Sequence, residues 1–190
     1  AFVLVFPPRN GKPWRWIPHY WVPMEQVEER ARRGDTTYRD WLDLEYLKAT
    51  PGPVIDYNIV AQDIIALSKK YNIVELPKDP WNSTQIGTVL MDEGLNVIDF
   101  AQVMSLYTAP TKEFLAAVAE KNILHGGHPV LRADVAAFAV MQDANGNMKP
   151  DRKASGGSID GLAGGLQGMG RAMISDDGPS IYETEDLLIL

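Results

Sequence analysis

The sequence contains no cysteine. This absence excludes disulfide frameworks, thiolate zinc sites and cysteine nucleophiles together, and it is consistent with a cytoplasmic protein. No apolar run approaches the roughly 18 to 20 residues that a membrane-spanning helix needs. The apolar opening over residues 1–6 lacks a basic start and a cleavage site, so it does not fit a signal peptide. We therefore expect no association with a membrane.

Positive charge is also scarce. The chain has 18 Lys and Arg residues against 25 Asp and Glu residues, a net charge of −7. This balance excludes an overall basic surface of the kind that nucleic-acid-binding domains usually carry. Any contact with DNA or RNA must be local, or must work through metal ions that offset the acidity. Otherwise the 190 residues, 45% of them hydrophobic, are typical of one globular domain.

The order of apolar segments predicts an α/β fold with a mixed central sheet flanked by helices. Strands are expected over residues 1–6, 17–23, 72–76, 95–100 and 137–142. Helices are expected over residues 24–33, 56–71, 82–93, 110–121, 130–136 and 159–173. Asn82 or Ser83 is expected to cap the third helix and Pro110 to lie in the first turn of the fourth. We expect one domain over residues 1–174, followed by a loosely held acidic tail over residues 175–190.

Asp79 is the first carboxylate that suggests chemistry. It follows an apolar strand and precedes Pro80, and ligands of open α/β sheets gather beyond such strand ends. A carboxylate there suits Mg²⁺ or Mn²⁺, which prefer oxygen ligands. The alternative is an ordinary Asp-Pro turn.

Asp160 is the second carboxylate that suggests chemistry. It lies in the first turn of the last predicted helix, which Ser158 can cap, beside a stripe of buried residues. The alternative is a charge that only complements the helix dipole. Glycines follow over residues 161–170, but they fall within a helical pattern, where small residues indicate close packing more often than phosphate binding.

The segment 143–147 resembles a calcium loop in its alternating oxygen ligands, so Asp143 is a further candidate metal ligand. The Asn-Gly pair within it favours a hairpin turn. Lys149, Arg152 and Lys153 follow as a small basic cluster that can contact phosphates.

Two further groups have alternative interpretations. His125 and His128 allow a two-histidine metal site, although a role in a turn is favoured because no carboxylate lies nearby in the sequence. The tryptophans and tyrosines of the first third of the chain allow stacking on bases. A small core beneath a long loop that holds Trp14 and Trp16 is favoured instead.

Six short motifs occur in a fixed order. They are Pro7-Pro8-Arg9, residues 50–57 (TPGPVIDY), residues 79–82 (DPWN), residues 125–132 (HGGHPVLR), residues 143–153 and residues 159–161 (IDG). In this order they resemble the C-terminal nuclease domain of the large terminase subunit of tailed bacteriophages, over roughly positions 1–173.

The resemblance implies an RNase H-like fold and a metal-dependent endonuclease that cuts concatemeric double-stranded viral DNA during packaging. Asp79 and Asp160 match two of the family's carboxylates, which hold two divalent ions, Mg²⁺ or Mn²⁺. The segment 142–153 matches the hairpin that borders the site. A fused ATPase domain, the small terminase subunit and the portal or procapsid are the implied partners, in the cytoplasm of the infected host.

Two departures limit the comparison. The family's first metal-binding Asp belongs to a strand just upstream of Ala1, so this chain alone is expected to be poorly active. His128 stands where Asn is expected in many relatives. The alternatives are a module that grips DNA or docks on the packaging machinery without cutting, and another RNase H-like enzyme such as a Holliday junction resolvase or integrase core.

Overall fold

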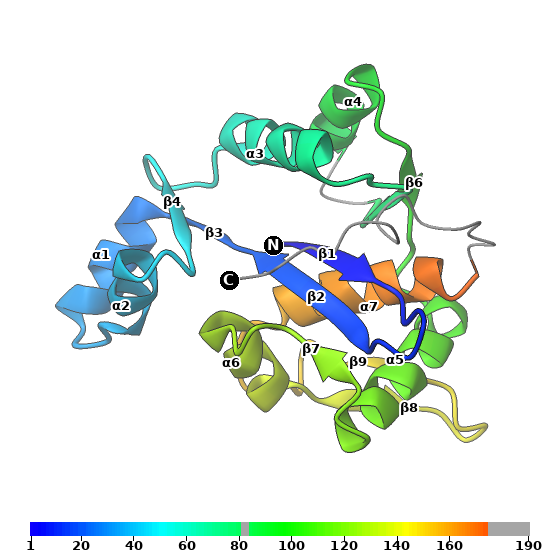
Figure 1. Cartoon of the computed structure of the whole chain (residues 1–190). Coiled ribbons are helices and arrows are strands. Elements are labelled where there is room, and N and C mark those ends of the chain that lie inside the picture. The colour runs from blue at the N-terminus through cyan, green and yellow to red at the C-terminus, as the bar shows by residue number, and fades with distance from the viewer. Residues whose placement is uncertain (81–83, 175–190) are drawn as a thin grey trace.

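A computed structural model describes residues 1–80 and 84–174 and has a mixed α/β architecture (Figure 1). Its strands are β1 (Phe2–Phe6), β2 (Trp14–His19), β3 (Trp21–Pro23), β4 (Lys48–Thr50), β5 (Leu76–Lys78), β6 (Val97–Asp99), β7 (Ile123–Leu124), β8 (Val140–Gln142) and β9 (Met148–Pro150). Its helices are α1 (Met24–Arg32), α2 (Thr37–Asp43), α3 (Tyr57–Lys70), α4 (Thr84–Asp92), α5 (Met104–Ala119), α6 (Pro129–Ala137) and α7 (Asp160–Ala172). No helix in these two ranges is both long and apolar enough to cross a membrane.

The strands form several small sheets. In the largest, β1 pairs antiparallel with β2, and β2 pairs parallel with β7. Two parallel pairs, β3 with β4 and β5 with β6, and one antiparallel hairpin of β8 and β9 complete the pattern. The mixture of parallel and antiparallel pairs is the arrangement expected from the sequence.

Helix α7 is central to the main core (Figure 1). It packs against β1 and β2 on one side and against α5 and α6 on others. Leu162, Leu166 and Met169 of this helix are fully buried. Its glycines allow the close approach, because a Cβ at Gly165 would overlap the ring of Trp16. The glycine-rich segment is therefore a packing face, as the helical pattern predicted.

A second, smaller core joins α3 and α4 to β5 and β6. Its buried members are Val60, Ala61, Ile64, Leu76 and Leu90. Helix α3 presents this face because its apolar residues recur at helical spacing, and Asp56 caps its start by accepting from the Asn58 N–H at 2.9 Å.

Two expectations about local structure were wrong. Trp14 and Trp16 lie in β2 and are 3% and 2% exposed, rather than in a loop over a separate small core. Alternate residues of β2 face the core, a period-2 pattern that the apolar Ile17 on the opposite face and Pro18 obscure in the sequence.

The second wrong expectation concerns Pro110, which lies inside α5 rather than in its first turn. The buried face of α5 runs through Tyr107, Pro110 and Phe114 without a break, so packing retains the helix despite the lost N–H. Strand β5 begins four residues later than expected. Two other expectations, the cap by Asn82 or Ser83 and the acidic tail, lie outside the described residues.

Candidate active site

Asp79 follows β5 directly, as the sequence predicted. Its Oδ2 accepts a hydrogen bond from Nε2 of Gln102, which lies just beyond the parallel neighbour β6. The main-chain carbonyl of Gln102 accepts in turn from Nζ of Lys149 on β9, at 3.2 Å. Gln102 thus connects Asp79 to the β8–β9 hairpin.

Asp160 is the first residue of α7, also as predicted. Its Oδ1 accepts from Nη1 of Arg152 at 2.6 Å, and its Oδ2 accepts from Oγ of Ser158 at 3.1 Å. Burial alone would raise the pKa of Asp160, but the hydrogen bond and charge of Arg152 outweigh it and keep that pKa below its ordinary value. Asp160 is therefore ionised at neutral pH.

Tyr107 interacts electrostatically with both Asp79 and Arg152. Burial raises the pKa of the Tyr107 hydroxyl to about 12, while the charge of Arg152 opposes the shift and that of Asp79 adds to it. Its hydroxyl accepts from Nε2 of Gln167 on α7, at 3.0 Å. Asp79 and Arg152 thus both act electrostatically on one buried tyrosine.

The two elements that carry the carboxylates are tied together elsewhere as well. Arg171, in the last turn of α7, makes a bidentate ion pair with Glu75, which directly precedes β5, at 2.7 and 3.1 Å. Helix α7 also contacts β5. Across residues 1–80 and 84–174, however, no group of three or more His, Asp or Glu side chains is arranged to hold a metal ion.

Asp134 is a functional candidate that the sequence reasoning missed. It lies on α6, is only 3% exposed, and its Oδ2 accepts from the Tyr20 hydroxyl at 2.9 Å and from the N–H groups of Gly161 and Leu162 at 2.7 and 3.3 Å. Burial raises the pKa of Asp134 despite these bonds. The available signal was a carboxylate on the same helical face as Val130 and Leu131, which are buried.

Asp134 also shares the capping of α7 with the predicted Ser158. Ile159 occupies the N-cap position without a side-chain hydrogen bond. The Oγ of Ser158 is 3.4 Å from the N–H of Asp160, and the next two N–H groups donate to Asp134. Ser158 is therefore not the N-cap residue, but its Oγ accepts from the first N–H of the helix, and a residue distant in the sequence supplies the acceptor for the next two.

The hairpin predicted from the Asn-Gly pair is present. Asp143 closes its turn by accepting from the N–H groups of Asn145 and Asn147, both at 2.9 Å, and from the Asn147 side chain at 2.8 Å. The hydrogen bonds from Asn147 lower the pKa of Asp143. Its carboxylate thus serves the turn, and its role as a metal ligand stays a prediction.

The predicted basic cluster follows the turn. Lys149 lies on β9 and reaches Gln102, Arg152 reaches Asp160, and Lys153 is exposed. Asp151 organises this segment, since its Oδ1 accepts from the N–H of Lys153 at 3.0 Å. The cluster therefore borders both candidate carboxylates.

The histidines hold a corner of the fold. His128 is the N-cap residue of α6 and packs against the rings of Tyr20 and Tyr46, with centroids 5.4 and 5.1 Å apart. Burial lowers the pKa of His128 to about 4, and the neighbouring His19 and His125 add to the shift. This neutral, aromatic-packed corner agrees with the turn role that was favoured over a metal site.

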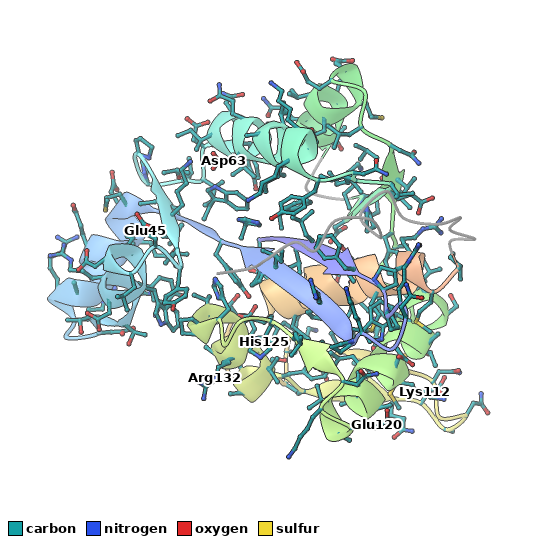
Figure 2. The ribbon with its side chains drawn as sticks, viewed as in Figure 1. Glu45, Asp63, Lys112, Glu120, His125 and Arg132 are labelled. Atoms are coloured by element: carbon teal, nitrogen blue, oxygen red, sulfur yellow. The ribbon has the colours of Figure 1, made fainter. Side chains whose placement is uncertain are left out.

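A pocket of about 470 Å³ lies beside this corner, between β3, β4 and α3. Asp63 of α3 (Figure 2) lines it and accepts from Nε1 of Trp21 at 2.7 Å and from Nζ of Lys48 at 2.6 Å. Neither Asp79 nor Asp160 lines this pocket. This pocket is thus distinct from the region of the candidate carboxylates.

Comparisons with known proteins agree with the motif order. The family model for the terminase large subunit endonuclease domain matches residues 1–176. Protein YmfN of Escherichia coli strain K12 is 29% identical over 178 residues, covering 90% of this chain and 37% of its own length. The large terminase subunit of Enterobacteria phage HK97 is 27% identical over 161 residues, covering 84% of this chain and 32% of its own length. The chain thus spans about a third of these relatives.

The fold also agrees with that of a solved structure. The crystal structure of the HK97 bacteriophage large terminase superposes with a TM-score of 0.79 at 26% identity, covering 88% of this chain and 35% of that one. The expected RNase H-like fold is thereby confirmed.

Proposed function

Because the chain belongs to the terminase large-subunit endonuclease domain family, we propose that it hydrolyses phosphodiester bonds of concatemeric double-stranded DNA in a metal-dependent reaction during viral DNA packaging. One observation carries the proposal. Asp79 and Asp160, far apart in the sequence, both connect to one basic segment, Asp79 through Gln102 to Lys149 and Asp160 directly to Arg152.

The donor chemistry suits a hard divalent cation. Carboxylate oxygens are the ligands that Mg²⁺ and Mn²⁺ prefer, and Arg152 keeps Asp160 ionised by lowering its pKa. Asp79 and Asp160 would hold the ions, two in number, with Asp143 as a further candidate. When bound, such ions activate water and stabilise the leaving oxygen. A third carboxylate, as the family resemblance implies, would complete the ligand set.

The basic segment would hold the substrate. Lys149, Arg152 and Lys153 border the carboxylates and can contact phosphates, which a chain with a net charge of −7 does not attract as a whole. A fused ATPase domain, the small terminase subunit and the portal or procapsid complete the proposed setting, in the cytoplasm of an infected bacterium.

A second function is a module that grips DNA or docks on the packaging machinery without cutting. The observation that favours it is that the described residues include no group of three His, Asp or Glu side chains arranged for a metal. Such a module needs neither Asp79 nor Asp160 for binding, so metal titration separates the two functions.

Calorimetric titration with Mn²⁺ tests the proposal on the 190-residue chain and its variants Asp79→Asn and Asp160→Asn. Each variant removes one negative oxygen ligand, so Mn²⁺ affinity should fall at least about tenfold. Asp40→Asn, at an exposed position on α2, is the matched control and should bind as the unchanged chain does. Plasmid cleavage in Mn²⁺, weak in the unchanged chain, should disappear in both site variants. Equal Mn²⁺ affinity in all four proteins would contradict the proposal and favour the non-cutting module.

A further inference from the structure

The start of α7 is held by another helix. The first N–H groups of a helix have no partner within it and need an acceptor from outside. Here the N–H groups of Gly161 and Leu162 donate to one oxygen of Asp134 on α6, at 2.7 and 3.3 Å. The position of the first turn of α7 thus depends on α6.

Tyr20 completes this contact from the sheet side. Its hydroxyl donates to the same oxygen at 2.9 Å, and a Cβ at Gly161 would overlap its ring, so the helix start lies directly against it. Asp134 and Leu162 are 3% and 0% exposed. The contact therefore joins α6, α7 and the residue after β2 inside the core.

The choice of a buried carboxylate needs an explanation beyond stability. Burying a charge is costly unless hydrogen bonds compensate for it. A helix start can be capped at lower cost by a local Ser or Asn, and Ser158 lies two residues before Asp160. An acceptor on α6 does what a local cap cannot, because it fixes the helix start relative to a separate element.

We propose that Asp134 is a positioning residue for Asp160, which stands immediately before the two N–H groups that Asp134 holds. This inference rests on the proposed function, in which Asp160 is a metal ligand. Ligands of a working site must be held to within about 0.5 Å by residues that are themselves fixed. Asp134 supplies that constraint through the N–H groups of Gly161 and Leu162, which directly follow Asp160.

The test compares Asp134→Ala with Asp134→Asn, and uses Arg132→Ala as the control on the same helix (Figure 2). Amide exchange by NMR should rise about tenfold at Gly161 and Leu162 in Asp134→Ala, and the carboxyl carbon signal of Asp160 should shift. Mn²⁺ affinity should fall about tenfold at a temperature where the protein stays folded. Asp134→Asn should restore most of each loss, because its amide oxygen accepts from the same donors.

A purely structural role predicts a different pattern: a lower midpoint of unfolding in Asp134→Ala with unchanged Mn²⁺ affinity, which would overturn the inference. Failure of Asp134→Asn to restore the affinity would also overturn it, since the charge rather than the hydrogen bonds would then matter. If Asp134→Ala does not fold, Tyr20→Phe removes one of the three donors and should change the same two amides by a smaller factor.

Different measurements would contradict the proposed function and the positioning role of Asp134. An unchanged chain that binds no Mn²⁺ contradicts the metal site. The exchange rates and the Asp160 signal need no metal, and no change in either in Asp134→Ala would overturn the positioning role by itself.

Discussion

At the scale of single residues, three carboxylates of this chain are held by different kinds of donor. Asp79 accepts from a side-chain amide, Asp160 from a guanidinium, and Asp134 from backbone N–H groups and a phenol. Only the guanidinium carries a full positive charge. In the proposed function, a divalent cation would compete with Arg152 for Asp160, and metal binding would have to displace or rearrange this ion pair.

Replacing Arg152 with Gln should raise the pKa of Asp160, since Arg152 is the main influence that lowers it. Mn²⁺ affinity should rise about two- to fivefold, the range expected when an exposed ion pair no longer competes. A ¹³C NMR titration of the Asp160 carboxyl carbon and a calorimetric Mn²⁺ titration measure the two effects. Lys153→Gln removes the same charge one residue away and should leave both unchanged.

The direction of the pKa shift of Asp160 determines the sign of the pH dependence of folding stability. Because the pKa of Asp160 is lower in the folded chain than in the unfolded chain, its contribution to stability is present above the ordinary carboxyl pKa and is lost as pH falls below it. Urea unfolding at a series of pH values should show that the free energy of unfolding falls less steeply with decreasing pH in Arg152→Gln than in the unchanged chain. Parallel curves, or a pKa of Asp160 that does not rise, would contradict the role given to Arg152.

At the scale of elements, α7 connects the core to the candidate site. Its glycines let it lie close to β1 and β2, and its first residue is Asp160. A shift of this helix away from the sheet would move Asp160 with it. Packing at the middle of α7 and geometry at its start are therefore linked.

Gly165→Ala should destabilise the fold by at least about 2 kcal/mol, because the added methyl overlaps the ring of Trp16, which is itself buried. Gly164→Ala is the matched control. Its Cβ would lie 3.8 Å from Val3, an ordinary contact, and better helix propensity should give a change of no more than about 1 kcal/mol in either direction. Chemical unfolding measures both. Equal stability of the two variants would show that α7 does not pack as described.

Local patterns predicted the elements whose signals are local. The helical spacing of α3 and the Asn-Gly turn between β8 and β9 were both confirmed. The contribution of Asp134 to the cap of α7 was not predictable in this way, because Asp134 and Gly161 are separated by 27 positions and only the tertiary fold brings them together. For Asp79 and Asp160, a strand end and a helix start indicated the positions. Gln102 carries no motif, so its bond to Asp79 was not predictable.

At the scale of the whole molecule, charge sets the limits on DNA binding. A net charge of −7 repels a polyanion. Attraction must then come from a region where basic side chains gather and where cations can neutralise the carboxylates. The segment from Lys149 to Lys153 borders both Asp79 and Asp160, so metal binding and DNA binding should reinforce each other there.

The combined replacement of Lys149, Arg152 and Lys153 by Ala should therefore weaken DNA binding and flatten its dependence on salt. Each phosphate contact contributes about 0.9 to the slope of log K against log salt concentration, so the slope should fall by about 1 to 3. Fluorescence anisotropy with duplex DNA, with Ca²⁺ in place of Mn²⁺ to avoid cleavage, measures the slope. The control removes three exposed arginines from α1, α2 and the turn between them, Arg32, Arg33 and Arg39, and so changes the net charge equally. If both triple variants lower the slope by the same amount, DNA responds to overall charge, and the basic segment is not the contact.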